Sequence, residues 1–430
     1  MALVPTRVRL PNGAVVIALE TPKLPAVSVN LAIRAGSIAD PADLPGATHL
    51  LGRVIDRGTL ARSAAVIADE LDDRAVSLNV VVTRHLFSID CTCLREDFDH
   101  VLSLLADIVM CPSIPEGELM VRKGEVVTAI RQDEDNPAVR AVEELMALLY
   151  MEPHPYGRRA KGTIDSVERA TRDALLRLHR DGFGPGALTA VVVGDLAASR
   201  AIDAATDCFG SWRASETLPR ASPLESAGVA GPHAKASDAR RQTVIPMMNK
   251  AQTDIAYGFR TIPRSDPSYY AFVLMNNVLG QYALGGRLGD SIRERQGMAY
   301  YVSSSFDANV LEGPLVIRAG VSAANVRRTI DSIDHELELI AREGVTLKEL
   351  DESRRYLIGS MPRALETNAG IARFLQTAEF FALGLDYDQR LPDLLGRVTL
   401  GDVHAAARTL DPARATVVVA GPYSDGGTGS

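Results

Sequence analysis

The chain has 430 residues, of which 46% are hydrophobic and 23% charged, and its formal net charge is -8. This length exceeds one ordinary core and predicts two to four domains of a soluble globular protein. The mild negative charge argues against a nucleic-acid surface. No apolar run approaches the length of a membrane span, and residues 1–7 lack the apolar core of a secretory signal, so we expect no membrane contact.

The four cysteines are typical of buried thiols in a reducing compartment, which predicts a cytoplasmic protein; they are Cys91, Cys93, Cys111 and Cys208. Cys91 and Cys93 would face the same side of a strand and could share a metal. Because no second close cysteine pair or cysteine–histidine cluster lies nearby, we favour a plain core role for both.

The first half of the chain alternates strand and helix patterns. A hairpin is predicted over residues 8–37, where two apolar β-rich runs flank the breaker Pro22-Lys23-Leu24-Pro25, and a loop over 39–45 leads into the first helix. Pro137 ends the helix predicted over 116–132, because proline disfavours the helical conformation in the residue before it. Further helices are predicted over 63–72, 98–109, 116–132 and 172–180, and strands over 76–90 and 187–193.

The second half repeats features of the first. Pro185 to Gly194 aligns with Pro412 to Gly421 at an offset of 227 residues, and residues 115–119 align with 346–350 at an offset of 231. Two ordered matches at nearly one offset favour an internal duplication. Residues 214–240, rich in Ser, Pro, Ala and Gly, are predicted to be a linker between a domain over 1–213 and a domain over 241–430. We therefore predict an α+β fold of two homologous domains, each a mostly antiparallel sheet with helices packed on one face.

Short motifs along nearly the whole chain give it a family resemblance. The motifs are Asn12-Gly13, Arg57-Gly58-Thr59, His154-Pro155-Tyr156-Gly157, Gly285-Gly286-Arg287-Leu288 and the tract from Ile292 to Tyr300. With these motifs the chain resembles the M16 (pitrilysin-like, inverzincin) metallopeptidases, and in particular the half-sized M16B type. That type includes bacterial heterodimers such as the pair that processes the precursor of the quinone cofactor PQQ.

The resemblance implies a vacated zinc site in the first half. Active members carry the motif histidine, two residues, glutamate, histidine, in which the histidines bind zinc and the glutamate activates water. Here His49 occupies the first ligand position, Gly52 the position of the base and Arg53 that of the second histidine. We therefore expect no metal bound by this chain, and no catalytic residues of its own.

The second helix of the family's zinc site points to the same conclusion. The third ligand, a glutamate about 80 residues beyond the first histidine, corresponds to Ala129, and a supporting glutamate seven residues earlier corresponds to Arg122. Glu125 lies one turn before Ala129. We favour a solvent-facing role for it; the alternative is that Arg53 replaces the missing cation and pairs with Glu125 or another nearby acid.

The second half keeps a pair that the family uses to hold substrate. The resemblance implies that Arg293 and Tyr300 bind the peptide, since a guanidinium and a phenol can donate hydrogen bonds to substrate carbonyls and to a developing oxyanion. In the alternative interpretation, Arg293 forms a surface ion pair with Glu294 or Asp290 while Tyr300 packs in the core.

These features together predict a non-catalytic subunit of a heterodimeric M16B zinc peptidase. It would close the chamber with a zinc-bearing homologue and help to bind peptide substrates, such as peptide precursors or leader peptides, for cleavage by that partner. The alternative is a structural or assembly subunit of a larger complex with no role in proteolysis; retention of Arg293 and Tyr300 favours the first interpretation.

Overall fold

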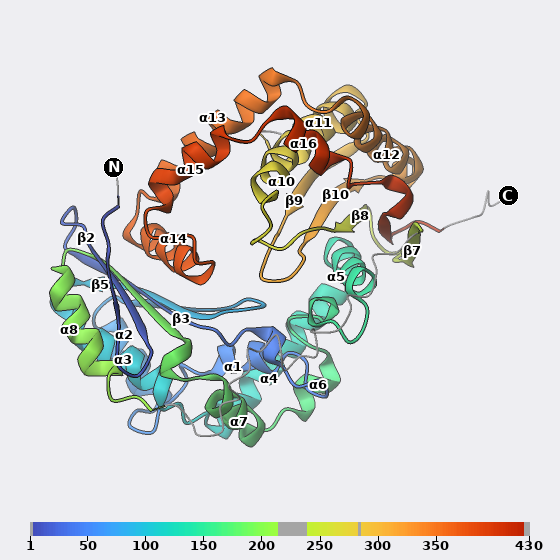
Figure 1. Ribbon diagram of the computed structural model, residues 1–430. Helices are drawn as coiled ribbons and strands as arrows, with labels where there is room; N and C mark the ends of the chain where they lie inside the picture. The colour runs from blue at the N-terminus through green and yellow to red at the C-terminus, as the bar shows by residue number, and fades with distance from the viewer. Residues whose placement is uncertain (1–2, 214–238, 283–284, 425–430) are drawn as a thin grey trace. The chain divides into compact units, whose positions relative to one another are not determined.

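The computed structural model describes residues 3–213, 239–282 and 285–424, and the chain packs into two compact units (Figure 1). Unit 1 comprises the described parts of residues 1–130, 158–231 and 361–389, and unit 2 those of residues 131–157, 232–360 and 390–430. The predicted linker over 214–240 lies, except for its last two residues, outside the described residues. Each unit is made of several separate segments of the sequence. The predicted domain boundaries at 213 and 241 divide the chain between its two duplicated halves, and these boundaries stay a prediction.

Unit 1 is built on a mixed sheet. Its strand order is β1-β2-β6-β3-β5-β4, and every pairing is antiparallel except that of β2 with β6. β-Branched and apolar residues fill the central strands, which are buried along most of their length. The strands are β1 Thr6–Arg9, β2 Val15–Glu20, β3 Ala26–Ile33, β4 Ser77–Val82, β5 Phe87–Leu94 and β6 Leu188–Gly194.

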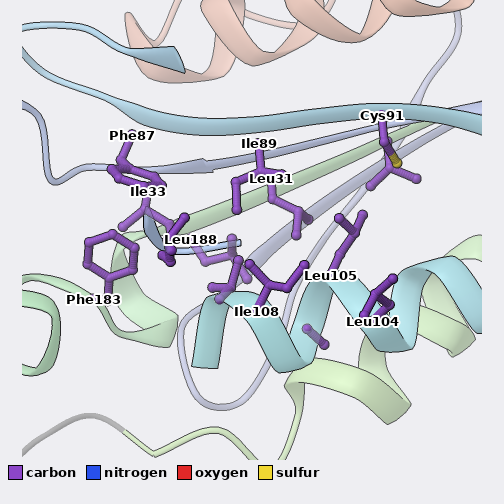
Figure 2. Close-up of a cluster of buried hydrophobic side chains, with 14 of the residues drawn as sticks. Leu31, Ile33, Phe87, Ile89, Cys91, Leu104, Leu105, Ile108, Phe183 and Leu188 are labelled. Carbon is purple, nitrogen blue, oxygen red and sulfur yellow. The ribbon is translucent and has the colours of Figure 1, made fainter. Parts of the chain in front are cut away.

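Helices from the same half of the chain cover one face of this sheet. In Figure 2, Leu31 and Ile89 of the sheet face Leu105 and Ile108 of α3, whose apolar residues recur at helical spacing. Cys91 and Cys93 belong to this core, and burial raises the pKa of the Cys93 thiol to about 12. The helices of this half are α1 Ala47–Val54, α2 Ala64–Asp72, α3 Phe98–Met110, α4 Glu116–Glu134, α6 Ile164–Arg169, α7 Arg172–Gly182 and α8 Ala198–Phe209.

The opposite face of the first sheet is covered by a helix from the other half of the chain. Helix α14 (Asn368–Phe380) places Ile371 and Leu375 against Ile17 and Val191 of the sheet, and all four side chains are buried. The sheet of unit 1 is therefore buried on both faces.

Unit 2 repeats this arrangement. Its strand order is β7-β11-β8-β10-β9, with only β7 and β11 parallel, so it matches unit 1 strand for strand once β1 is set aside. Its strands are β7 Arg241–Pro246, β8 Thr253–Arg260, β9 Ala299–Phe306, β10 Pro314–Val321 and β11 Thr416–Gly421. Its helices are α10 Tyr269–Asn276, α11 Gly286–Leu288, α12 Val326–Glu343, α13 Leu347–Ala364, α15 Tyr387–Gly396 and α16 Leu400–Ala407, with π-helical segments η5 Asn277–Gln281 and η6 Gly289–Arg295.

The second sheet also receives a helix from the opposite half. Helix α5 (Pro137–Tyr150) packs Ala141 and Leu145 against Ala256 and Val418. It begins at residue 137 and α14 at residue 368, which is the same offset of 231 that separates the starts of α4 and α13 at residues 116 and 347. The exchange of helices is therefore reciprocal, and the predicted α+β fold of two homologous domains with mostly antiparallel sheets is confirmed.

Two predicted elements differ from the structure. The two runs of the hairpin expected over residues 8–37 do not pair with each other, because β6 lies between β2 and β3 and pairs with both. The strand expected over residues 76–90 is a hairpin of β4 and β5, because residues 83–86 turn the chain and Thr83 Oγ1 accepts a hydrogen bond from the Leu86 amide. Within the described residues, no helix is long and apolar enough to cross a bilayer.

Candidate functional site

Helix α1 carries the first three positions of the expected zinc motif, and a buried carboxylate holds its N-terminus. Asp40 accepts hydrogen bonds from the backbone N–H groups of Gly46 and Thr48, at 2.7 and 2.8 Å, and from the Thr48 hydroxyl. Burial raises the pKa of Asp40 to about 6, although these hydrogen bonds oppose the shift. Leu50 and Leu51 are fully buried, so the orientation of α1 on the unit 1 core is determined.

The position of the catalytic base is sterically closed. A Cβ atom built at Gly52 would lie 2.7 Å from Cγ2 of Val82 and 3.5 Å from Cγ1 of Val80, both on β4. The glycine lets α1 approach the edge of the sheet more closely than any other residue would permit. On the same helix, His49 is half-buried and Arg53 is exposed.

Helix α4, the second helix of the expected site, forms an ion-pair cluster with Arg53 of α1. This arginine–glutamate cluster consists of Arg53, Arg122, Glu118 and Glu125. Arg53 Nη2 lies 3.3 Å from Glu125 Oε2, and Arg122 Nη1 donates to the other oxygen of the same carboxylate. The hydrogen bond from Arg122, with that from Arg53, holds the pKa of Glu125 below its usual value. Arg122 also lies 3.5 Å from Glu118.

Both interpretations of Glu125 hold in part. The carboxylate is partly exposed, as the favoured solvent-facing interpretation expects, and it pairs with Arg53, as the alternative expects, and with Arg122. Ala129, one turn further along α4, contributes only a methyl group. The guanidinium of Arg53 thus stands as the cation beside the carboxylate.

The donor set at these positions does not fit zinc. His49 alone offers a metal-binding atom, whereas zinc in proteins takes three or four nitrogen, sulfur or oxygen ligands. Across the described ranges no group of three or more His, Cys, Asp or Glu side chains is arranged to hold a metal ion.

An edge strand lies beside the vacated site. β4 contacts α1 and is the last strand of its sheet among those described, and its residues alternate between exposed and half-buried. The outer edge of such a strand presents backbone N–H and C=O groups that an extended peptide can pair with.

The expected substrate-binding pair lies in unit 2. Tyr300 is the second residue of the edge strand β9 and is 84% exposed, so the alternative in which it packs in the core is wrong. Arg293 lies on η6, is half-buried and has its Nε 3.6 Å from Glu294 Oε1, which is the ion pair of the alternative interpretation. The tyrosine hydroxyl is therefore presented to solvent, while the arginine is held by a loose surface pair.

Sequence reasoning missed two features of this site. The role of Asp40 in capping α1 could have been inferred from its place six residues before Gly46, in a loop that precedes a helix without a side-chain N-cap of its own. The closure at Gly52 had no such signal, because it depends on β4, thirty residues further along the chain.

Two family descriptions match most of the chain. "Insulinase (Peptidase family M16)" matches residues 15–160, and "Peptidase M16 inactive domain" matches residues 169–357. The chain belongs to the M16 peptidase family. The M16 assignment agrees with the duplicated topology and with the motifs seen in the sequence.

Relatives over nearly the same length bear differing descriptions. The chain is 26% identical to the uncharacterized zinc protease YmxG of Bacillus subtilis, over 84% of this chain and 85% of that one. It is 25% identical to the non-peptidase homolog YmxG of Helicobacter pylori, over 90% and 87% respectively. The chain also resembles the crystal structure of a peptidase M16 inactive domain from Pseudomonas fluorescens, with a TM-score of 0.88. The two sequences are 25% identical, and the match covers 98% of each chain.

Proposed function

We propose that this M16 chain is a non-catalytic subunit of a heterodimeric peptidase, which helps to bind peptides for cleavage by a zinc-bearing homologue. One observation carries the proposal: the position of the second ligand holds Arg53, paired with Glu125, and the position of the base holds a glycine against which β4 packs. The similarity to an M16 inactive domain and to a non-peptidase homolog supports the non-catalytic part.

The residues of this chain act on the substrate rather than on water. The exposed phenol of Tyr300 donates a hydrogen bond to a peptide carbonyl, and Arg293 leaves its surface pair with Glu294 to donate to a neighbouring carbonyl or to the developing oxyanion. The pair holds the peptide in the chamber, and the partner supplies zinc, the base and the attacking water. Precursor or leader peptides in the cytoplasm are the proposed substrates.

The test compares this chain alone, a zinc-bearing M16 homologue alone, and the two together. Zinc content is measured by atomic absorption and cleavage with a library of fluorogenic peptides. The chain alone is expected to hold no stoichiometric zinc and to cleave nothing, while the mixture cleaves. Zinc-dependent cleavage by this chain alone would overturn the proposal.

Substitutions in the complex test the donor pair. Tyr300→Phe and Arg293→Ala are each expected to lower kcat by about 100–1000-fold, the range seen for loss of one oxyanion donor. Arg295→Ala is the matched control, since Arg295 is an exposed arginine on the same segment with its Nε 3.0 Å from Asp290. Full activity in both test variants would favour the structural-subunit alternative instead.

A further inference from the structure

Unit 2 contains a cavity that the proposed function does not use. It has a volume of about 420 Å³ and lies between η5, α11, η6 and α13. Its size is within the range of small-molecule sites. Every residue that lines it belongs to unit 2, so the cavity depends on this one unit alone.

The backbone around this cavity is irregular in a way that opens space. The π-helical segments η5 and η6 both contribute lining residues, and π-helical turns are frequent at functional sites. Between them, Gly286 has φ 57° and a Cβ there would lie 2.3 Å from the carbonyl oxygen of Val278. This turn therefore needs glycine, and it places η5 beside α11.

The lining carries an excess of negative charge. Four carboxylates and one guanidinium border the cavity. The guanidinium of Arg287 already donates two hydrogen bonds to the Glu349 carboxylate, both at 2.7 Å. Although burial opposes the shift, this bidentate pair, together with the hydrogen bonds from Thr346, lowers the pKa of Glu349 to about 2. These two charges neutralise each other, so the remaining three carboxylates determine the sign of the site.

Among the described residues, those three carboxylates form ion pairs at the surface of the unit. Asp290 pairs with Arg295 at 3.0 Å, Glu294 with Arg293 at 3.6 Å and Glu352 with Lys348 at 4.0 Å. Exposed pairs of this kind contribute little and are screened by salt. A ligand cation that enters the cavity can therefore compete with them.

A buried amide borders the same cavity with part of its hydrogen-bonding capacity unused. Asn277 is fully buried; its Oδ1 accepts a hydrogen bond from Ser353 Oγ at 2.8 Å, while its Nδ2 has no partner among the described residues. If the amide is turned over, Nδ2 donates to Ser353 and the oxygen is the unused atom. Buried polar groups are nearly always paired, so either orientation points to a polar ligand atom at this position.

The remaining wall is apolar and aromatic. Val278 lines the cavity, and the ring of Tyr282 stands edge-on to that of Tyr356 with centroids 5.0 Å apart. An aromatic face beside carboxylates attracts an organic cation through its quadrupole as well as through charge.

We propose that this cavity binds an organic cation, an ammonium or guanidinium group on a short apolar stem. Asp290, Glu294 and Glu352 attract the charge, Val278 and Tyr282 contact the stem, and the Asn277 amide, in the orientation that leaves its oxygen unused, accepts one hydrogen bond from the cation. The cation is the side chain of a lysine or arginine residue in a peptide, or a free amine; the chemistry is shared, and the test separates the two sources. The proposal stands without the proposed peptidase function.

The test titrates the full chain by calorimetry with four probes. These are N-acetyl-arginine amide, N-acetyl-lysine amide, the free diamine cadaverine, and the neutral control N-acetyl-norleucine amide. At least one cationic probe is expected to bind with Kd of about 1 mM, a usual affinity for ligands of this size, and binding weakens when salt is raised from about 0.05 to 0.5 M. Tighter binding of the blocked residues assigns a peptide side chain, and tighter binding of cadaverine assigns a free amine.

Charge-neutral variants locate the binding. Glu294→Gln and Glu352→Gln keep side-chain size and are each expected to weaken the cationic probes about 3–10-fold. Glu343→Gln, an exposed acid paired with Arg342 outside the cavity, is the matched control and leaves Kd unchanged. The proposal is overturned if no cationic probe saturates by about 10 mM, if norleucine amide binds equally well, or if the control variant weakens binding as much as the other two.

Discussion

The closure at Gly52 predicts that adding even one methyl group there destabilises unit 1. In the Gly52→Ala variant, the new Cβ would lie 2.7 Å from Val82 Cγ2, which no relaxed contact allows. Overpacking of this kind costs about 1–3 kcal/mol. The replacement of a helical glycine by alanine contributes about 1 kcal/mol in the opposite direction. The expected net loss in free energy of unfolding is therefore about 0–2 kcal/mol.

A matched glycine separates the two contributions. Gly124 lies in α4, and a Cβ built there meets nothing within 4 Å, so Gly124→Ala is expected to stabilise by about 0.5–1 kcal/mol. Urea unfolding followed by circular dichroism measures both variants against the parent chain. Val82→Ala in the Gly52→Ala background relieves the clash, so the two substitutions couple favourably in a double-mutant cycle. Stabilisation by Gly52→Ala equal to that by Gly124→Ala would refute the steric argument.

Two further predictions concern charged groups of unit 1. A double-mutant cycle of Arg53→Met and Glu125→Gln is measured by urea unfolding. The coupling free energy is expected to be below about 1 kcal/mol and to shrink in 1 M salt, because both side chains are largely exposed. A larger coupling free energy that does not depend on salt contradicts this. Burial raises the pKa of Asp40 to about 6 in the folded state from its ordinary value of 3.8 in the unfolded chain, so the folded state binds more protons between these values. The free energy of unfolding therefore falls by about 1–3 kcal/mol as pH rises from 4 to 6, and Asp40→Asn flattens this slope. An unchanged slope in the variant would assign the pH dependence to other groups.

Much of the vacated site could be predicted because its residues are close in sequence or lie at helical spacing. His49, Gly52 and Arg53 occupy one short helix, as expected. Arg122 and Ala129, seven residues apart, lie on the same side of helix α4. The partial exposure of Glu125 agrees with the favoured interpretation, but its pairing with Arg53 stayed one of two alternatives, because sequence spacing does not show which helix packs beside α4. Only packing brings Arg53, seventy-two residues earlier, within 3.3 Å of that carboxylate.

The exposure of Tyr300 shows the same limit. An aromatic residue at the start of a strand is as compatible with a core as with a surface, because successive side chains of a strand point to opposite faces. Its neighbour Tyr301 turns inward and donates a hydrogen bond to Asp254 at 2.6 Å, while Tyr300 is left exposed. A register shift in the pairing of β9 with β10 leaves Tyr300 unpaired between Ala299 and Tyr301, and this irregularity accompanies its exposure.

The sequence by itself determined the local elements and the duplication. Both depend on the order of residues along one segment, because the spacing of apolar residues selects helix or strand. The matching sequences before Gly194 and Gly421 form β6 and β11, which occupy equivalent places in the two sheets. The exchange of α5 and α14 was decided only in three dimensions. An amphipathic helix specifies that one face must be buried, but not which sheet buries it, and each of these helices covers the sheet of the opposite half.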